Sequence, residues 1–201
     1  MSLLRKTNTL SQSLSFLKLN MFKKPMIQKE FRKPLTIIGC NYEGKINGFS
    51  KALQHTAESF VKFTGKPLQC NYFGGLYYDE PHKFSDSNSL WNLFIVLEDE
   101  QLIKELKHTI IPYHYISTIP QSVALKCQLP NENELSVLFG MMRAYPTLNK
   151  YLKDNLYPKP SGMMELYNNV DSTMEFIYFL NNSEYFEELK ENSFLKVDDL
   201  E

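Results

Sequence analysis

The sequence predicts an α+β domain in which two strand-helix-strand-strand repeats form one continuous sheet, with helices on one face and a central groove. Two observations support this prediction: the same order of apolar patterns occurs twice along the chain, and short sequences echo between the two copies. A length of 201 residues suits one domain of ordinary size with short extensions.

The first repeat covers residues 35–97. Residues 35–40 are a short β-branched run, residues 68–78 form an aromatic run interrupted by Gly74 and Gly75, and residues 89–97 are almost continuously apolar, which predicts three strands. Between the first two strands, apolar residues recur at helical spacing over residues 49–63, and Gly65 with Pro67 ends the pattern.

The second repeat covers residues 113–180. Residues 99–107 form a short connecting helix, and residues 113–119 and 122–129 have the composition of strands. A helix then runs to about residue 156, where we expect Pro146 to kink or divide it. Residues 163–168 and 173–180 are the last two strands, so the order of the first repeat recurs.

Local sequences also correspond between the repeats. Residues 75–77, Gly-Leu-Tyr, match residues 165–167, Glu-Leu-Tyr, and the apolar run 90–97 matches 173–180. This correspondence places Asn92 opposite Glu175. Copies of this kind associate to cover their sheet edges, so we expect one continuous sheet across residues 34–181.

The segments outside that domain differ in charge. Residues 1–33 form a basic N-terminal extension whose first 29 residues contain no acid, which suits mitochondrial targeting, a membrane-surface helix or a solvated tail. Residues 182–201 form an acidic tail. No stretch approaches the roughly 18 apolar residues of a transmembrane helix, and three widely spaced cysteines in apolar surroundings indicate a reducing, cytoplasmic location.

Three sequences resemble the GyrI-like small-molecule-binding domain, within the wider group that also contains the haem-associated SOUL proteins. They are the loop at residues 75–83, the helix at 138–152, and residues 164–167 followed by 175–180. The resemblance implies a paired-repeat fold whose groove accepts flat, apolar or cationic compounds over a carboxylate. The animal branch that the chain resembles most acts in autophagy of the endoplasmic reticulum and has an N-terminal membrane anchor.

Glu175 is the first candidate for a groove carboxylate. It lies on an apolar strand, where an acid is costly unless it is paired or faces a ligand, and Asn92 would present an amide beside it. An edge position facing water is the alternative. Glu165 is a second candidate, although its place before Leu166 and Tyr167 suggests alternation with solvent.

Several aromatic residues are candidates for the groove lining because aromatic faces hold flat ligands and cations. They are Tyr42, Tyr77, Trp91, Tyr113 and Tyr178. The alternative for each is an ordinary core position, and strand alternation prevents all of them from facing one pocket.

Enzymatic chemistry has little support in the sequence. No nucleophile-base, phosphate-cradling or metal-ligand pattern is present, so no cofactor is predicted, and haem ligation is unsupported apart from His114. Some GyrI-like proteins hydrolyse strained rings, and Glu175 with Trp91 keeps that option open. The near-neutral charge, with 22 basic and 23 acidic residues, disfavours nucleic acid as a partner.

The tail contains a short motif of the type used by autophagy receptors. Phe186, Glu187, Glu188 and Leu189 have the aromatic and aliphatic spacing with which an extended peptide adds a strand to a ubiquitin-like modifier. The alternative is an amphipathic helix in which Phe186 and Leu189 pack on the domain.

Overall fold

The computed structural model describes residues 25–45, 48–65, 70–78, 89–107, 111–131 and 134–200. In these residues nine strands form one sheet of order β1-β6-β8-β7-β3-β4-β2-β5, with β9 paired to part of β2. The strands are β1 (Ile27–Arg32), β2 (Leu35–Gly44), β3 (Tyr72–Tyr77), β4 (Ser89–Val96), β5 (His114–Ile119), β6 (Ser122–Pro130), β7 (Gly162–Asn168), β8 (Thr173–Phe179) and β9 (Phe194–Lys196). The helices are α2 (Phe49–Thr64), α3 (Glu100–Leu106), α4 (Glu134–Asp154), α5 (Ser183–Lys190) and the 3-10 turn η3 (Val197–Asp199).

The predicted α+β class and paired repeats are confirmed. The first repeat is β2-α2-β3-β4, the second is β6-α4-β7-β8, and they join through the antiparallel pair β3–β7. Gly65 ends α2 as predicted, at a φ of 63°, and Asp99 caps α3 by accepting from two backbone N–H groups. Pro146 does not divide α4, because the buried residues Ala144, Tyr145 and Leu148 hold the helix against the sheet on either side of it.

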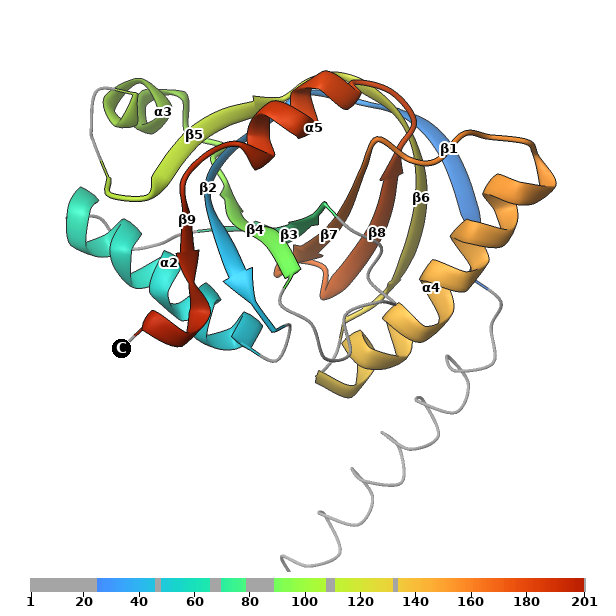
Figure 1. Ribbon diagram of the computed structural model, residues 1–201, viewed down its shortest axis with the longest axis horizontal. Coiled ribbons are helices and arrows are strands. Elements are labelled where there is room, and N and C mark those ends of the chain that lie inside the picture. The colour runs from blue at the N-terminus through green and yellow to red at the C-terminus, as the bar shows by residue number, and fades with distance from the viewer. Residues whose placement is uncertain are drawn as a thin grey trace, which may run out of the picture.

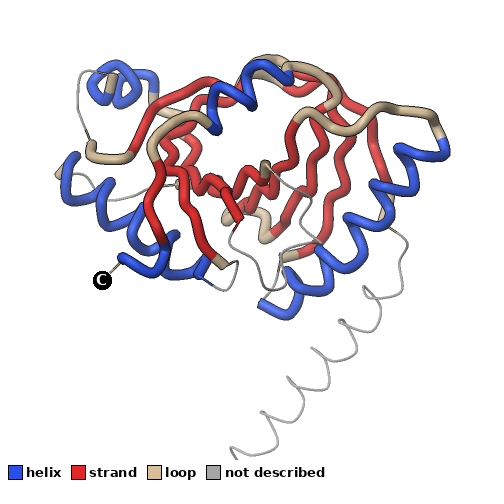
Figure 2. Tube along the Cα trace, viewed as in Figure 1, coloured by secondary structure: helices blue, strands red, loops and turns tan. Residues whose placement is uncertain are grey.

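The strands β1 and β5 each pair with the repeat other than the one that follows them directly in the chain: β1 pairs with the second repeat and β5 with the first. β1 leads into β2 through only two residues but pairs with β6 at the other end of the sheet, whereas β5 leads into β6 but pairs with β2. A two-residue connection spans at most about 11 Å, so each connection draws one end of the sheet toward the other. The sheet therefore curves strongly, as the arch of strands in Figure 2 shows.

Segments expected to lie outside the domain contribute to this sheet. Residues 27–32 of the expected extension form β1, and the expected tail supplies α5 and β9. Residues 1–24, which include most of the proposed targeting segment, lie outside the described residues. No helix in the described part of the chain is long and apolar enough to cross a membrane.

The two faces of the sheet have different cores. On the helix face, α2 and α4 pack over side chains such as Tyr42, Trp91 and Phe176. On the inner face, residues from both ends of the curved sheet and from its centre meet in one cluster that includes Ile119, Ala124 and Leu76. Figure 1 shows α2 and α4, the helices of the two repeats, on one side of the sheet as predicted, and α5 from the tail on the other.

Candidate ligand-binding site

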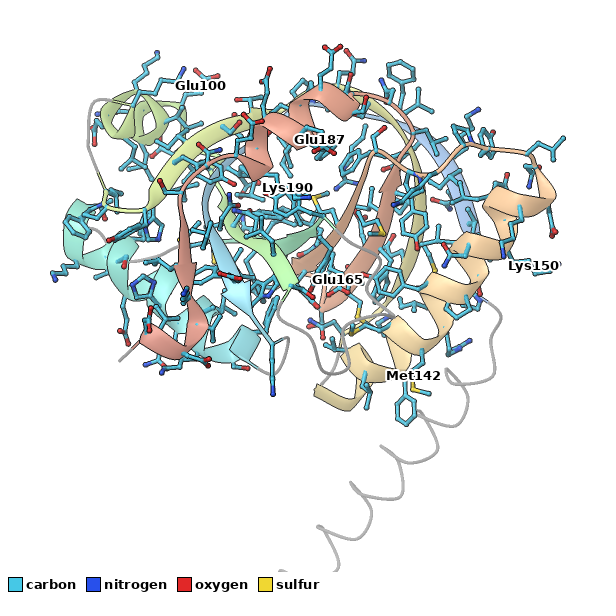
Figure 3. All side chains as sticks on the ribbon, in the orientation of Figure 1. Glu100, Met142, Lys150, Glu165, Glu187 and Lys190 are labelled. Atoms are coloured by element: carbon cyan, nitrogen blue, oxygen red, sulfur yellow. The ribbon has the colours of Figure 1, made fainter. Side chains whose placement is uncertain are left out.

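Glu165 occupies the centre of the helix face. It lies on β7 opposite Gly75 of β3, at the strand pair where the two repeats join, and its residue is 1% exposed. Figure 3 shows Glu165 near the middle of the molecule. The expectation that Glu165 alternates with solvent was wrong, because every residue of β7 is buried: the helix-face core covers one of its faces and the inner-face core covers the other.

Three tyrosine hydroxyls donate hydrogen bonds to this carboxylate. Tyr145 of α4 donates to Oε1 at 2.5 Å, and Tyr167 and Tyr77 donate to Oε2 at 2.6 Å and 3.1 Å. A buried carboxylate is tolerated when hydrogen bonds replace its water shell. Hydroxyls supply dipoles rather than a countercharge, however, and no described Lys or Arg forms an ion pair with Glu165.

Gly75 makes room for this arrangement. A Cβ at Gly75 would lie 3.2 Å from the Tyr77 hydroxyl and 3.4 Å from the Phe49 ring. The repeats correspond at Gly75 and Glu165, so the same structural position holds an acid in one copy and no side chain in the other. This asymmetry places one carboxylate, instead of two repelling ones, at the centre of the junction.

Burial controls the protonation of the cluster. It raises the pKa of the Glu165 carboxyl above its ordinary value of 4.5, and the hydrogen bonds from Tyr145, Tyr167 and Tyr77 oppose that shift. Burial and the nearby charge of Glu165 raise the pKa of all three tyrosines well above 10, so their hydroxyls stay protonated as donors.

Aromatic rings surround the carboxylate cluster. Phe49 stacks on Trp91 with centroids 5.9 Å apart and meets Tyr167 edge-on at 6.5 Å. Phe73 stacks on Tyr167 at 5.1 Å. Phe49 and Phe73 are half-buried, whereas Trp91 and Tyr167 are buried, so the outer rings of the group reach the surface.

Glu175 and Asn92 lie on the inner face, away from Glu165. Glu175 forms ion pairs with Arg32 at 3.0 Å and Lys126 at 3.3 Å, whereas Asn92 donates to Asn41 and Tyr115. Each has its own partners, and no contact joins the two among the described residues. Trp91 faces the opposite side of the sheet from Glu175, so the pair considered for ring hydrolysis does not form.

The remaining aromatic candidates lie in three settings. Tyr77 contacts Glu165 directly, and Tyr178 is a buried neighbour that stacks on Tyr145 at 6.1 Å and donates to Asn149. Tyr42 is a core residue whose hydroxyl forms a hydrogen bond with the Thr56 hydroxyl of α2. Tyr113 is 56% exposed at a bend before β5 and lies outside the cluster.

The tail motif is folded against the domain. Phe186 and Leu189 are each 3% exposed and pack on the inner face, whereas Glu187 and Glu188 of the same helix are exposed. The Phe186 ring lies 4.9 Å from that of Phe179, and Asn41 donates to the carbonyl oxygen of Leu189 at 3.0 Å. The amphipathic-helix alternative for this segment is therefore the one that the structure forms.

Sequence reasoning missed Tyr145 and Tyr167 as members of the site. Tyr167 follows Glu165 by two residues, which puts both side chains on one face of a strand, and that spacing was readable. Tyr145 comes from α4, and only the packing of α4 on β6 and β8 brings its hydroxyl to the carboxylate.

Comparisons with known proteins agree with this fold. No protein-family model matches the chain, and no curated protein matches it. The crystal structure of the EcmrR C-terminal domain is 14% identical with a TM-score of 0.58, covering 79% of this chain and 98% of that one. EcmrR in its DNA complex, within EcmrR-RPo, is also 14% identical with a TM-score of 0.58, covering 86% of this chain and 63% of that one.

A third structure, SAV2435 bound to tetraphenylphosphonium, is 13% identical with a TM-score of 0.47, covering 83% of this chain and 99% of that one. The predicted GyrI-like resemblance is confirmed at the level of the fold. The finer resemblance, to the animal autophagy receptor testis-expressed protein 264, has no support from the sequence comparisons.

Proposed function

We propose that this domain is a non-enzymatic binding module that takes a small lipophilic cation onto Glu165 at the junction of its repeats. The observation that carries the proposal is a carboxylate that is 1% exposed, holds three tyrosine hydroxyls and has no ion-pair partner among the described residues. A bound cation would supply the missing charge.

The surrounding rings suit the same class of guest. Aromatic faces attract cations, and this attraction strengthens when water is excluded. Phe49 already contacts both Trp91 and Tyr167 beside the carboxylate, so an aromatic cation would replace ring contacts with similar ones. The fold shared with the EcmrR C-terminal domain is compatible with this role and does not by itself assign it.

Calorimetric titration with tetraphenylphosphonium tests the proposal, because this probe combines one delocalised positive charge with aromatic surface. We expect saturable binding that Glu165→Gln weakens by about 30-fold, the equivalent of roughly 2 kcal/mol for one desolvated charge interaction. Glu175→Gln is the matched control, since it removes an acid from the opposite face, and it should bind normally. Equal binding by wild type and Glu165→Gln, or no binding by wild type at millimolar probe, would overturn the assignment.

An adaptor role through the tail is the competing proposal, and the contacts of α5 oppose it. Addition of a strand to a ubiquitin-like modifier requires residues 186–189 to be extended with both apolar side chains free. Here they are helical, and Phe186 and Leu189 are buried. This role would require α5 to leave the inner face before it could operate.

A further inference from the structure

A hollow lies on the inner face, across the sheet from Glu165. Its volume is about 730 Å³, and it is bounded by the β1–β2 connection and by the ends of β3, β4 and β7. Small-molecule sites commonly have volumes of roughly 300–1,000 Å³. The hollow therefore has the size of a binding site, and the sheet separates it from the cluster around Glu165.

Four charged side chains form a ring in the hollow. Arg32 contacts Glu30 at 2.9 Å and Glu175 at 3.0 Å, while Lys126 contacts the same two acids at 3.1 Å and 3.3 Å. Their side chains are only 15–27% exposed. Partly buried ion pairs add little net stability, so stability alone does not explain them.

The charged ring also interrupts the apolar pattern of inner-face residues on the strands that carry it. On β8 the inner-face positions beyond Glu175 are the buried residues Ile177 and Phe179, and on β6 the inner-face neighbour of Lys126 is Ala124. The inner face is thus apolar under α5 and charged in the open hollow. This change of character along single strands indicates a surface built to meet a polar guest.

Arg32 retains unused hydrogen-bonding capacity. Both of its ion pairs are made by Nη1, and no contact among the described residues engages Nη2 or Nε. By contrast, each of the four oxygens of Glu30 and Glu175 already has a cation partner. The free edge of the guanidinium is the geometry that binds a carboxylate.

Acids and apolar side chains complete the lining. Glu98 and Asp171, from the ends of β4 and β7, are exposed acids, and each uses one oxygen to accept from a neighbouring asparagine. Leu166 and Val96 provide buried apolar surface between the charged walls. The lining therefore offers a donor for an anion, acceptors for an ammonium group and an apolar strip.

We propose that this hollow is a second binding site, which takes a small zwitterion of the amino-acid or dipeptide class. Its carboxylate binds the free edge of Arg32, its ammonium group faces Asp171 and Glu98, and its side chain lies on Leu166 and Val96. This site is independent of the cation site at Glu165, so either can fail without the other.

Titration of the full chain, followed by calorimetry and by NMR shifts of residues around the hollow, tests the assignment. The probes are L-phenylalanine and L-alanyl-L-phenylalanine, with the N-acetylated and C-amidated dipeptides as matched controls. We expect one of the two zwitterions to bind saturably and both capped forms to bind at least tenfold more weakly. The better zwitterion identifies the length of guest.

Variants of Arg32 sharpen the test. Arg32→Gln should weaken zwitterion binding at least tenfold, and Arg32→Lys should restore only part of it because a lysine lacks the planar pair of donors. Glu165→Gln should leave zwitterion binding unchanged, while both Arg32 variants should keep the circular dichroism spectrum of wild type, which verifies their fold without relying on the cation site. No saturable shifts with either zwitterion at millimolar concentration, or equal binding of the amidated dipeptide, would overturn the proposal.

Discussion

Glu165 and Glu175 are ten residues apart on neighbouring strands, yet the sheet places them in opposite environments. Glu165 lies on the helix face, where three tyrosine hydroxyls donate hydrogen bonds to it. No cationic side chain among the described residues pairs with it. Glu175 faces the inner hollow and is bound by Arg32 and Lys126. The comparison shows that the partners of a carboxylate, more than its apolar sequence neighbours, decide whether it is available to a cationic guest.

The largest expected effect concerns the covered end of the inner face. Phe186→Ala should lower the free energy of unfolding by about 4 kcal/mol, because it leaves a cavity beside Phe179 and Gly162. Urea denaturation measures the change. Glu188→Ala, on the exposed side of α5, should stay within about 0.5 kcal/mol of wild type. Similar small losses for both variants would show that α5 does not hold the inner face.

A smaller effect is expected at the Glu165 cluster. Tyr145→Phe should destabilise the protein by about 2 kcal/mol at pH values above the raised pKa of Glu165, where it removes a hydrogen bond to a charged acceptor. Tyr178→Phe is the control on the same face of the sheet. The Tyr178 hydroxyl donates to the neutral amide of Asn149, so its removal should lower the free energy of unfolding by about 1 kcal/mol. If the two losses were equal, the acceptor of Tyr145 would not be an ionised carboxylate.

The pH dependence of stability separates the two acids. Because the pKa of Glu165 is raised in the folded state, its protonated form stabilises the fold below the ordinary value of 4.5, and that contribution is lost as pH rises through the folded pKa. Relative to Glu165→Gln, wild type should therefore lose up to about 1.4 kcal/mol per pH unit across that window. Thermal or urea unfolding from pH 4 to pH 9 measures the difference, and parallel curves for the two proteins would contradict the raised pKa.

The smallest effect is expected at the charged ring. Glu175→Gln should destabilise by about 1 kcal/mol or less, because Glu30 still pairs with both Arg32 and Lys126. Added salt should reduce the difference in free energy of unfolding between wild type and Glu175→Gln, because salt screens the ion pairs of the ring. A salt-independent loss of several kcal/mol would mean that the ring is a buried structural element instead of part of an open hollow.

Much of the fold was predictable because periodicity reports local structure directly. The helical spacing of residues 49–63 and the apolar runs at 89–97 and 173–180 predicted α2, β4 and β8 close to their observed bounds. The repeat also predicted the pairing of the two halves. The position of β1 was not predictable, because its pairing with β6 depends on contacts nearly a hundred residues away in the chain.

The candidate site was predictable only in part. Glu165 and Tyr77 were among the proposed residues, but Glu175 was placed first because the sequence shows an acid on an apolar strand without showing its partners. Arg32 lies on β1, in a segment expected to be an extension, so its pairing with Glu175 was invisible in the sequence.

The sequence by itself determined that this chain forms two related α+β units and offered two acids, Glu175 and Glu165, as candidates for the groove between them, since spacing and duplication are properties of the chain. The tertiary structure decided which face each carboxylate occupies and which groups meet it. The pairing of β1 with β6 brings Arg32 to Glu175, and helix packing brings Tyr145 to Glu165. Both are long-range contacts, and they decide which of the two acids lacks a countercharge.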